Sequence, residues 1–503
     1  MNTQVRALSL CWILLCWAGT AGAKPGEGGA RASLYLPLES RISQEVERMA
    51  ILTGMPCLIL PYPLETVRLY NQRIRGSHPD LYRKIARELD RLERGHWVRA
   101  GAEAGLGVGS GGRWTIPNAY GLDNRSAGRL AATWVTGSTA GSVAASLGLG
   151  LREEAGHPYF YAGNAYLSVG IPHGAGLQLD LGWRDRWYGV RGDGTLLMST
   201  QAQNAPAVSL QNQRPWTRLR LRGEIFAALL ERSPDILHLG ERRSGRPALI
   251  GMTASLEPIP ILEMGLTRTF QFGGAGRAGF TMARLWNAFF WPADADNSNP
   301  DLSRDEEFGN QLAAASARIH IPSAGLRLYG VYGAEDTSRN SNRGLGVRAR
   351  ILGFYWLLGP VRLLGERTYF RDRWYVHFIY GAGYTNRGNV MGHWFGDTRA
   401  PGDGRGGYAN SASIAWDFAG ENSIEAHYRS MEVQNTSRAY PAPPLRYVLG
   451  QEFGATLFLS LPESGSASAP EHRTRPRLEL SAAGGRTPLD RDFTSFRASV
   501  SIL

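Results

Sequence analysis

The sequence predicts a mainly β fold: a transmembrane antiparallel β-barrel that follows a small N-terminal α-helical bundle. Three observations lead to this prediction. The chain begins with a segment typical of exported proteins, and most of the remaining sequence alternates between polar and apolar residues. Short and long connections alternate between these segments. Glycine (62 residues) and aromatic residues (10%) are both abundant, which fits a barrel of closely paired strands.

The first residues have the layout of a secretory signal peptide. Arg6 precedes an apolar run at 7–18, and Ala21-Gly22-Ala23 fits a cleavage site of small residues. The run is shorter than the roughly 20 apolar residues that a membrane-spanning helix needs. We therefore expect residues 1–23 to be removed, which leaves Cys57 as the remaining cysteine and no internal disulfide. No later apolar run is long enough for a helical membrane protein.

Residues 24–95 are expected to form a periplasmic helical segment. The stretches ESRISQEVERMAILTG (39–54) and PDLYRKIARELDRLERG (79–95) place apolar residues three and four positions apart, as in amphipathic helices. Ser40 fits the start of the first helix and Gly54 its end. Each helix has one apolar face, so the bundle is expected to pack against a neighbouring domain.

Residues 96–503 are expected to form the barrel, because the apolar period changes there from 3.6 to 2. The segments TRLRLRGEIFAALL (217–230) and SFRASVSIL (495–503) alternate clearly. In the second segment the residues expected to face outward are Phe496, Ala498, Val500 and Ile502, and those expected to face inward are Arg497, Ser499 and Ser501. Soluble sandwiches alternate as well, but charges that recur on one strand face suit a polar lumen. At roughly 20–24 residues per strand and connection, the region accommodates about 16–20 strands.

The connections support a barrel that spans a membrane. Segment 289–312 is long and polar, and the next connection, 321–325, is a tight turn. Segment 333–344 is again expected to be a long polar loop, and Gly359-Pro360 a tight turn. Long connections on one side and short ones on the other are the rule for outer-membrane barrels.

The motifs do not indicate catalysis. The G-x-G-x-x-G match at 274–279 has no βαβ context, so a glycine-rich turn is preferred over a dinucleotide site. Metalloprotease, nucleophile-elbow and C-x-x-C motifs are missing, and the histidines are scattered. The paired carboxylates at 306–307 and 335–336 fit solvated or Ca²⁺-compatible loops better than a glycosidase pair. We therefore expect no enzyme, no catalytic residues, no cofactor and no metal, although a Ser-His pair formed in space stays an alternative.

The stretch 181–210 is similar to a known family. Arg186-Trp187-Tyr188-Gly189, then Gly194-Thr195-Leu196-Leu197, then Ser199 to Pro206 resemble, in this order, segments of the Wzi family of outer-membrane capsule-assembly proteins. Further segments that resemble this family occur in order along the chain at 35–54, 262–277, 309–313, 329–336 and 392–397. The chain departs from the family in ending with Leu503 rather than an aromatic residue, and in having Tyr188 where a second Trp is common.

This resemblance implies an outer-membrane barrel of 18 strands with the helical bundle at its periplasmic mouth. It also implies a lectin-like role, in which the protein attaches or organises capsular or exopolysaccharide at the cell surface. The alternative function is an outer-membrane pore for polysaccharide export or solute uptake. Other expected partners are outer-membrane lipid and lipopolysaccharide, with no nucleic acid, and the protein is expected to be a monomer.

The high arginine content has two interpretations, a codon bias or an adaptation to carboxylates of acidic sugars or lipopolysaccharide, and the second leads us to expect an acidic polysaccharide. The net charge is +11, and only Lys24 and Lys84 are lysines among the 55 basic residues. Guanidinium groups bind carboxylates through paired hydrogen bonds, and aromatic faces stack on sugars. The residues predicted to bind carbohydrate are Arg186, Trp187, Tyr188, Arg304, His393 and Trp394. The competing interpretation is architectural, because Trp and Tyr form the interfacial girdle of any barrel and Arg forms ion pairs in its lumen.

Overall fold

The structure is a computed structural model of the chain. It describes residues 31–38, 41–93, 97–109, 115–122, 128–154, 157–171, 176–277, 279, 281–291, 303, 305–338, 341–418, 422–435, 445–461 and 476–502. The expected signal peptide, Ser40 and Arg304 lie outside the described residues.

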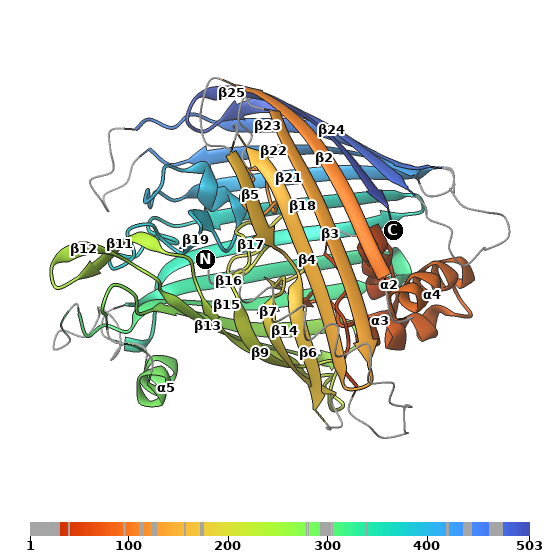
Figure 1. The fold of residues 1–503 in the computed structure, drawn as a ribbon, viewed down its shortest axis with the longest axis horizontal. Coiled ribbons are helices and arrows are strands. Elements are labelled where there is room, and N and C mark those ends of the chain that lie inside the picture. The colour runs from red at the N-terminus through yellow and green to blue at the C-terminus, as the bar shows by residue number, and fades with distance from the viewer. Residues whose placement is uncertain are drawn as a thin grey trace.

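A closed antiparallel barrel of 18 strands forms the body of the described chain (Figure 1). The first wall strand, β2 (Trp97–Gly109), pairs with the last, β25 (Arg491–Ile502), from Ala100↔Ile502 to Gly109↔Phe493, and this ladder closes the wall. Closure leaves no free sheet edge at this seam, as a membrane-spanning sheet requires.

The remaining wall strands follow one another in chain order. They are β3 (Gly128–Ala140), β4 (Val143–Glu154), β5 (His157–Ala162), β6 (Ala165–Ile171), β7 (Leu177–Trp183), β9 (Ala207–Asn212), β10 (Arg222–Leu229), β13 (Ala248–Ile259), β14 (Leu262–Phe272), β15 (Gly309–Ile321), β16 (Leu326–Ser338), β17 (Ser341–Leu358), β18 (Val361–Phe370), β21 (Gly407–Phe418), β22 (Asn422–Val433), β23 (Gly450–Ser460) and β24 (Arg477–Thr487). Segments β5 and β6 pair with successive parts of β4 and so occupy one strand position.

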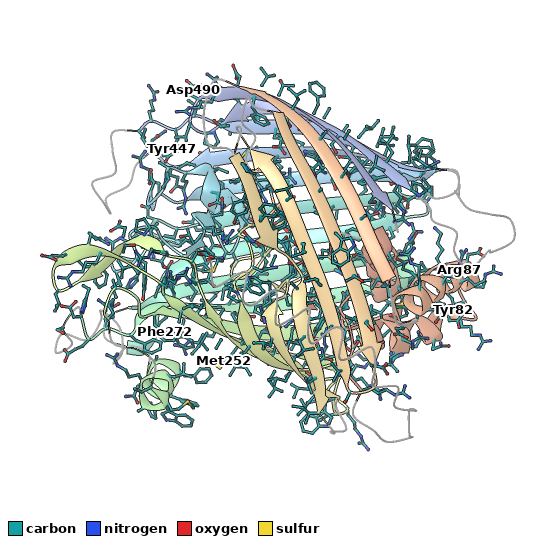
Figure 2. The ribbon with its side chains drawn as sticks, viewed as in Figure 1. Tyr82, Arg87, Met252, Phe272, Tyr447 and Asp490 are labelled. Carbon is teal, nitrogen blue, oxygen red and sulfur yellow. The ribbon has the colours of Figure 1, made fainter. Side chains whose placement is uncertain are left out.

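The wall alternates as the sequence predicts, with side chains on both of its faces (Figure 2). On β25, Phe496 and Val500 are exposed on the outer face, whereas Arg497 and Ser499 line a cavity inside the barrel. Apolar residues therefore face the surroundings and polar residues face the lumen, which is the arrangement of a barrel embedded in lipid.

The N-terminal helices pack together at one end of the barrel (Figure 1). They are α2 (Arg41–Thr53), α3 (Leu64–Asn71), the 3-10 turn η1 (Gln72–Ile74) and α4 (Pro79–Glu93). Helices α2 and α4 confirm the two predicted helices, and Gly54, with φ +67°, follows α2 as its predicted end. Helix α2 contacts β15 and the short turn η2 (Pro322–Ala324), so the bundle covers the end with short connections. None of the described helices is long and apolar enough to cross a membrane.

Two predictions about local structure are wrong. The strand predicted at 217–230 begins at Arg222, because Trp216 and Leu221 close a tight turn that the Asn212 side chain stabilises. The predicted long loop at 333–344 is mostly strand, since β16 continues to Ser338 and β17 begins at Ser341. A strand that projects beyond lipid needs no apolar outer face, so its polar composition resembles that of a loop.

Two segments between wall strands fill the lumen. The first inner segment, 184–206, connects β7 to β9 and contains β8 (Trp187–Tyr188), which pairs with β1 (Ile59–Leu60) of the N-terminal region. The second inner segment, 371–406, connects β18 to β21 and contains β19 (Thr385–Asn386), β20 (Asn389–Val390) and η3 (Trp394–Thr398). Both segments contribute to one large buried cluster together with the helices. The hairpin β11 (Ser233–His238) and β12 (Glu241–Gly245) lies at the opposite end from the helices, and α5 (Met282–Phe290) lies beside the wall (Figure 1).

A closed hydrogen-bonded wall should resist detergent at room temperature. We expect the purified protein to migrate faster on an SDS gel when it is left unheated than after boiling, because the intact barrel is more compact than the unfolded chain. The measurement is the mobility of paired heated and unheated samples. Identical mobility of the two samples, with recovery in the soluble fraction, would contradict a closed membrane barrel.

Candidate functional site

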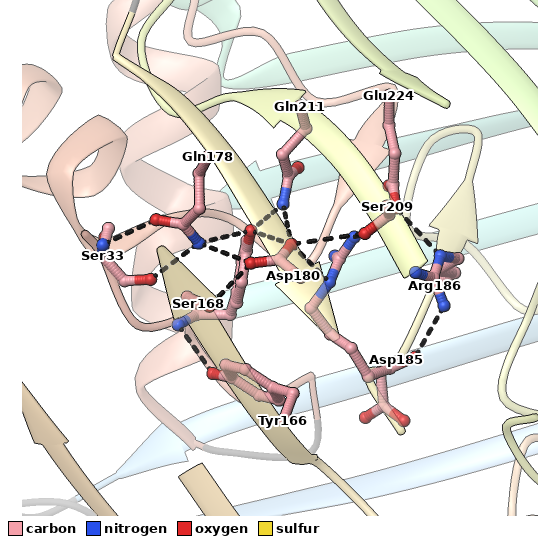
Figure 3. A network of polar contacts seen from close by, with 12 residues as sticks. Ser33, Tyr166, Ser168, Gln178, Asp180, Asp185, Arg186, Ser209, Gln211 and Glu224 are labelled. Carbon is pink, nitrogen blue, oxygen red and sulfur yellow. Dashed lines mark hydrogen bonds and ion pairs between the residues drawn. The ribbon is translucent and has the colours of Figure 1, made fainter. Parts of the chain in front are cut away.

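Buried acidic residues of the wall hold the first inner segment in place. Arg184 forms ion pairs with Asp180 of β7 (3.3 Å) and Glu224 of β10, and Arg186 Nε donates to the same Glu224 at 2.9 Å. Figure 3 shows Asp180 at the centre of this network, where the Gln178 amide donates to it at 2.8 Å. Because both charges of each pair are buried, breaking a pair would leave an uncompensated ion in the lumen.

A second network fixes the N-terminal region to the adjacent part of the wall, formed by β13, β14 and β15. Glu263 of β14 accepts the backbone N–H of Cys57 at 2.7 Å and the guanidinium Nε of Arg318 at 3.1 Å. Arg318 also pairs with Glu257 of β13, and its guanidinium donates to the backbone carbonyl of Gly54 at 3.3 Å. This arrangement supplies hydrogen-bond partners to backbone groups of an irregular segment between α2 and β1.

The second inner segment is held in the same way. Glu335 of β16 accepts the backbone N–H of Tyr375 at 2.8 Å. Thr368 of β18 lies 3.0 Å from His393 Nε2, and Glu366 of the same strand lies 3.4 Å from it. Polar wall residues therefore serve to bind the filling segments.

The structure places the predicted site residues inside this filling. Arg186, Trp187 and Tyr188 are no more than 4% exposed; Trp187 Nε1 donates to the Val190 carbonyl at 3.1 Å, and Tyr188 lies opposite Ile59 in the β1–β8 pair. His393 and Trp394, from the other inner segment, are also buried. The sixth residue, Arg304, lies outside the described residues. That these residues bind carbohydrate stays a prediction.

A polar cavity of about 520 Å³ lies between the wall formed by β22–β25 and β2–β5, the connection after β2, and Arg191 of the first inner segment. It extends from Tyr120 in the connection after β2 to Gln44 of helix α2. The charged and aromatic residues around it include Arg152, Tyr161, Arg191, His427, Arg429, Glu452, Glu479 and Arg497. This mixture of guanidinium groups, carboxylates and tyrosine rings is typical of surfaces that bind polar, hydroxyl-rich ligands.

One side of the cavity is a fixed ion network. Arg429 of β22 donates to Asp193 of the first inner segment at 2.7 Å and pairs with Glu452 of β23. The Trp394 ring lies behind it, with the ring centroid 5.5 Å from the guanidinium carbon, and Trp394 Nε1 donates to Asp193 at 3.0 Å. Asp193 and Trp394 thus join the two inner segments at the cavity, and Arg429 is already neutralised.

The cavity is also lined by two arginines that have no acidic partner among the described residues. Arg152 of β4 lies over the rings of Tyr159 and Tyr161, at 4.7 and 5.7 Å, and donates a hydrogen bond to the Tyr120 carbonyl at 3.4 Å. Its buried Nε has no hydrogen-bond partner. Within the described ranges, no carboxylate forms an ion pair with Arg152 or with Arg191, which lines the same cavity. Two such guanidinium groups can donate hydrogen bonds to the carboxylates of a ligand.

Sequence reasoning missed this pair of arginines. Arg191 lies within the 181–210 stretch that the sequence singled out, but nothing distinguishes it there from its neighbours. Arg152 lies in an ordinary alternating strand, and only barrel closure brings it to the cavity that Arg191 also lines.

Fold and lumen together define the class of protein: an outer-membrane type β-barrel whose interior is filled by its own inner segments. A family model for the capsule assembly protein Wzi matches residues 101–481. The chain belongs to this Wzi family of capsule-assembly proteins, and it is an outer-membrane protein. No curated protein sequence gives a significant match.

One solved structure agrees with this fold over most of the chain. The structure of Wzi from Escherichia coli, described as an outer-membrane protein involved in group 1 capsule assembly and as a carbohydrate-binding β-barrel, aligns with a TM-score of 0.65. It is 16% identical, and the alignment covers 93% of this chain and 98% of that one. The structure of OprD from Pseudomonas aeruginosa aligns with a TM-score of 0.45 at 12% identity, over 82% of this chain and 96% of that one.

The network around Glu263 generates a prediction for Cys57. The thiol is buried, and this burial raises its pKa to about 12, so it stays protonated and unreactive at neutral pH. Glu263→Ala removes the acceptor of the Cys57 backbone N–H and leaves Arg318 with one acidic partner fewer. We expect maleimide labelling of Cys57 at pH 7 to rise at least about tenfold, since each ~1.4 kcal/mol lost from local packing raises the open fraction tenfold.

The matched control is Glu479→Ala, which also removes a lumenal carboxylate paired with an arginine, here Arg497 of β25. This variant should label as slowly as the parent at pH 7. The parent itself should label faster as the pH rises toward 12, because the thiolate fraction then increases. Equal labelling of Glu263→Ala and the parent would show that Glu263 does not hold this segment.

Proposed function

We propose that the protein binds an acidic capsular or exopolysaccharide and attaches it to the cell surface without catalysis. The observation that carries this proposal is the polar cavity with two guanidinium groups that have no carboxylate partner within the described residues. Family membership supports the link to capsule, and the Escherichia coli relative is described as carbohydrate-binding. In this proposal the helical end faces the periplasm, because the short connections lie there.

In this proposal some residues of the cavity contact the polysaccharide, and others hold the cavity in shape. Arg152 and Arg191 bind uronate-type carboxylates, and the Tyr120 and Tyr161 side chains lining the same cavity contact the sugar rings. Of the residues predicted from the sequence, Trp394 lies next to the cavity through Arg429 and Asp193. We assign Trp394 a supporting role: its ring and its bond to Asp193 help to fix the Arg429 network that forms one side of the cavity.

Single substitutions of the two arginines test this proposal. Arg152→Ala and Arg191→Ala should each weaken binding of an acidic polysaccharide to the purified barrel about tenfold or more. The reason is that a hydrogen bond to a charged group contributes about 1.5–3 kcal/mol. Binding to the parent should also fall as salt rises, since salt screens accessible charges. The measurement is polysaccharide binding to the purified barrel in detergent, with unheated gel mobility as the check on folding.

Arg243→Ala is the matched control, because Arg243 is an exposed arginine of strand β12 that pairs with Glu241 and lies away from the cavity. It should bind polysaccharide as the parent does. In cells, the two cavity variants should make polymer but release more of it into the medium. If both cavity variants bind and retain polymer like the parent, the cavity is not the binding site.

A pore is the second candidate, because the cavity extends along the lumen from Tyr120 to Gln44 of α2. Helix α2 of the N-terminal bundle lies at one end of this cavity, where Gln44 lines it. A binding barrel should give little steady current in planar lipid bilayers, since the inner segments and helices fill the lumen. Sustained open-channel conductance of the parent protein would favour the pore over the binding protein.

A further inference from the structure

Helix α5 covers part of the outer wall. Along β14, Met264 and Leu266 point outward and are 48% and 69% exposed, as expected for residues that face lipid. Phe270 continues the same row, yet it is fully buried. It is buried because α5 and the Phe308 ring pack on it, and Figure 2 shows Met252 and Phe272 on the wall next to this helix.

The helix is attached by apolar and charged contacts. Leu285 and Ala288 of α5 belong to a cluster with Ile250 and Phe270 of the wall. Arg268, the outward residue between Leu266 and Phe270, donates to the backbone carbonyls of Ala288 and Phe289, both at 2.6 Å. A cation at a helix C-terminus is favourable, and an arginine facing lipid without cover would be costly. Thus α5 is fixed in orientation against the wall.

The face of α5 turned away from the wall is apolar and uncovered. Met282 is 70% exposed, Trp286 58% and Phe290 47%, and Trp291, directly after the helix, is 47% exposed. The Trp286 and Phe290 rings contact each other with centroids 4.3 Å apart. The helical repeat places Asn287 on a third, polar face. A nine-residue helix with this division has the pattern of segments that lie in the membrane interface.

We propose that α5 is an interfacial anchor that inserts Trp286, Phe290 and Met282 into the lipid leaflet at the loop end of the barrel. The lipid is assigned as the occupant because the apolar face of α5 lies on the outer side of the barrel, beside the outward row in which Met264 and Leu266 are exposed as lipid-facing residues are. Tryptophan is also enriched at the boundary between headgroups and acyl chains. The anchor ties the long β14–β15 connection to the membrane surface and so fixes its position beside the barrel mouth.

Labelling at single cysteines tests the anchor. In a Cys57→Ser background of the mature chain, Trp286→Cys is labelled with the fluorophore NBD and the protein is reconstituted into phosphatidylcholine vesicles. We expect a blue-shifted emission and at least twofold quenching when the vesicles carry lipids with a nitroxide on the upper acyl chain. Asn287→Cys, one position further on the polar face of the same helix, should show neither effect.

Folding of each labelled protein is checked by unheated gel mobility, and Phe290→Cys replaces Trp286→Cys if that variant does not fold. Equal quenching at 286 and 287, or no quenching at either, would overturn the proposal. A blue shift at 286 that appears only at high protein density and is insensitive to nitroxide lipid would also overturn it, because that face would then bind another protein.

Discussion

A wall of 18 strands encloses a lumen that its own side chains cannot fill, and this constraint explains much of the interior. Three chain segments fill the lumen: the two inner segments and the N-terminal region. Irregular backbone brings N–H and carbonyl groups that need partners away from water. Inward-facing carboxylates supply them, as when Glu263 accepts from Cys57 and Glu335 accepts from Tyr375. The charges in the lumen are therefore first a means of holding chain segments against the wall.

This origin of the lumenal charges gives a criterion for the binding site. A buried ion contributes to structure when its partner is present, as for Arg318 with Glu257 and Glu263. Arg152 differs, because its guanidinium rests on tyrosine rings and no carboxylate of the described residues pairs with it. A cation that the fold does not neutralise in a polar cavity is available to a ligand, whereas the arginines that are paired with wall carboxylates are not.

Local patterns predicted the parts of the fold that follow a regular period. The helices at 39–54 and 79–95 and the strand at 495–503 have one clear apolar face each, and the structure has all three. Helix α3, of eight residues, was too short to show a period. The burial of Trp394 was not predictable either, since a polar and aromatic segment reads as a surface loop unless the barrel that surrounds it is known. The cavity depends on contacts between strands that are distant in sequence, so no local sequence pattern predicts it.

The closing ladder between β2 and β25 joins the two ends of the wall, and each inner segment is attached to the wall at both of its own ends. Both inner segments thus lie inside a wall whose closure depends on β25, the last strand of the chain. The chain must therefore be delivered completely before the final seam forms, and joining ends so distant in sequence is slow. The rate of assembly is thus set by the joining of the two chain ends, and until then the unpaired edges of β2 and β25 have to be kept from aggregating.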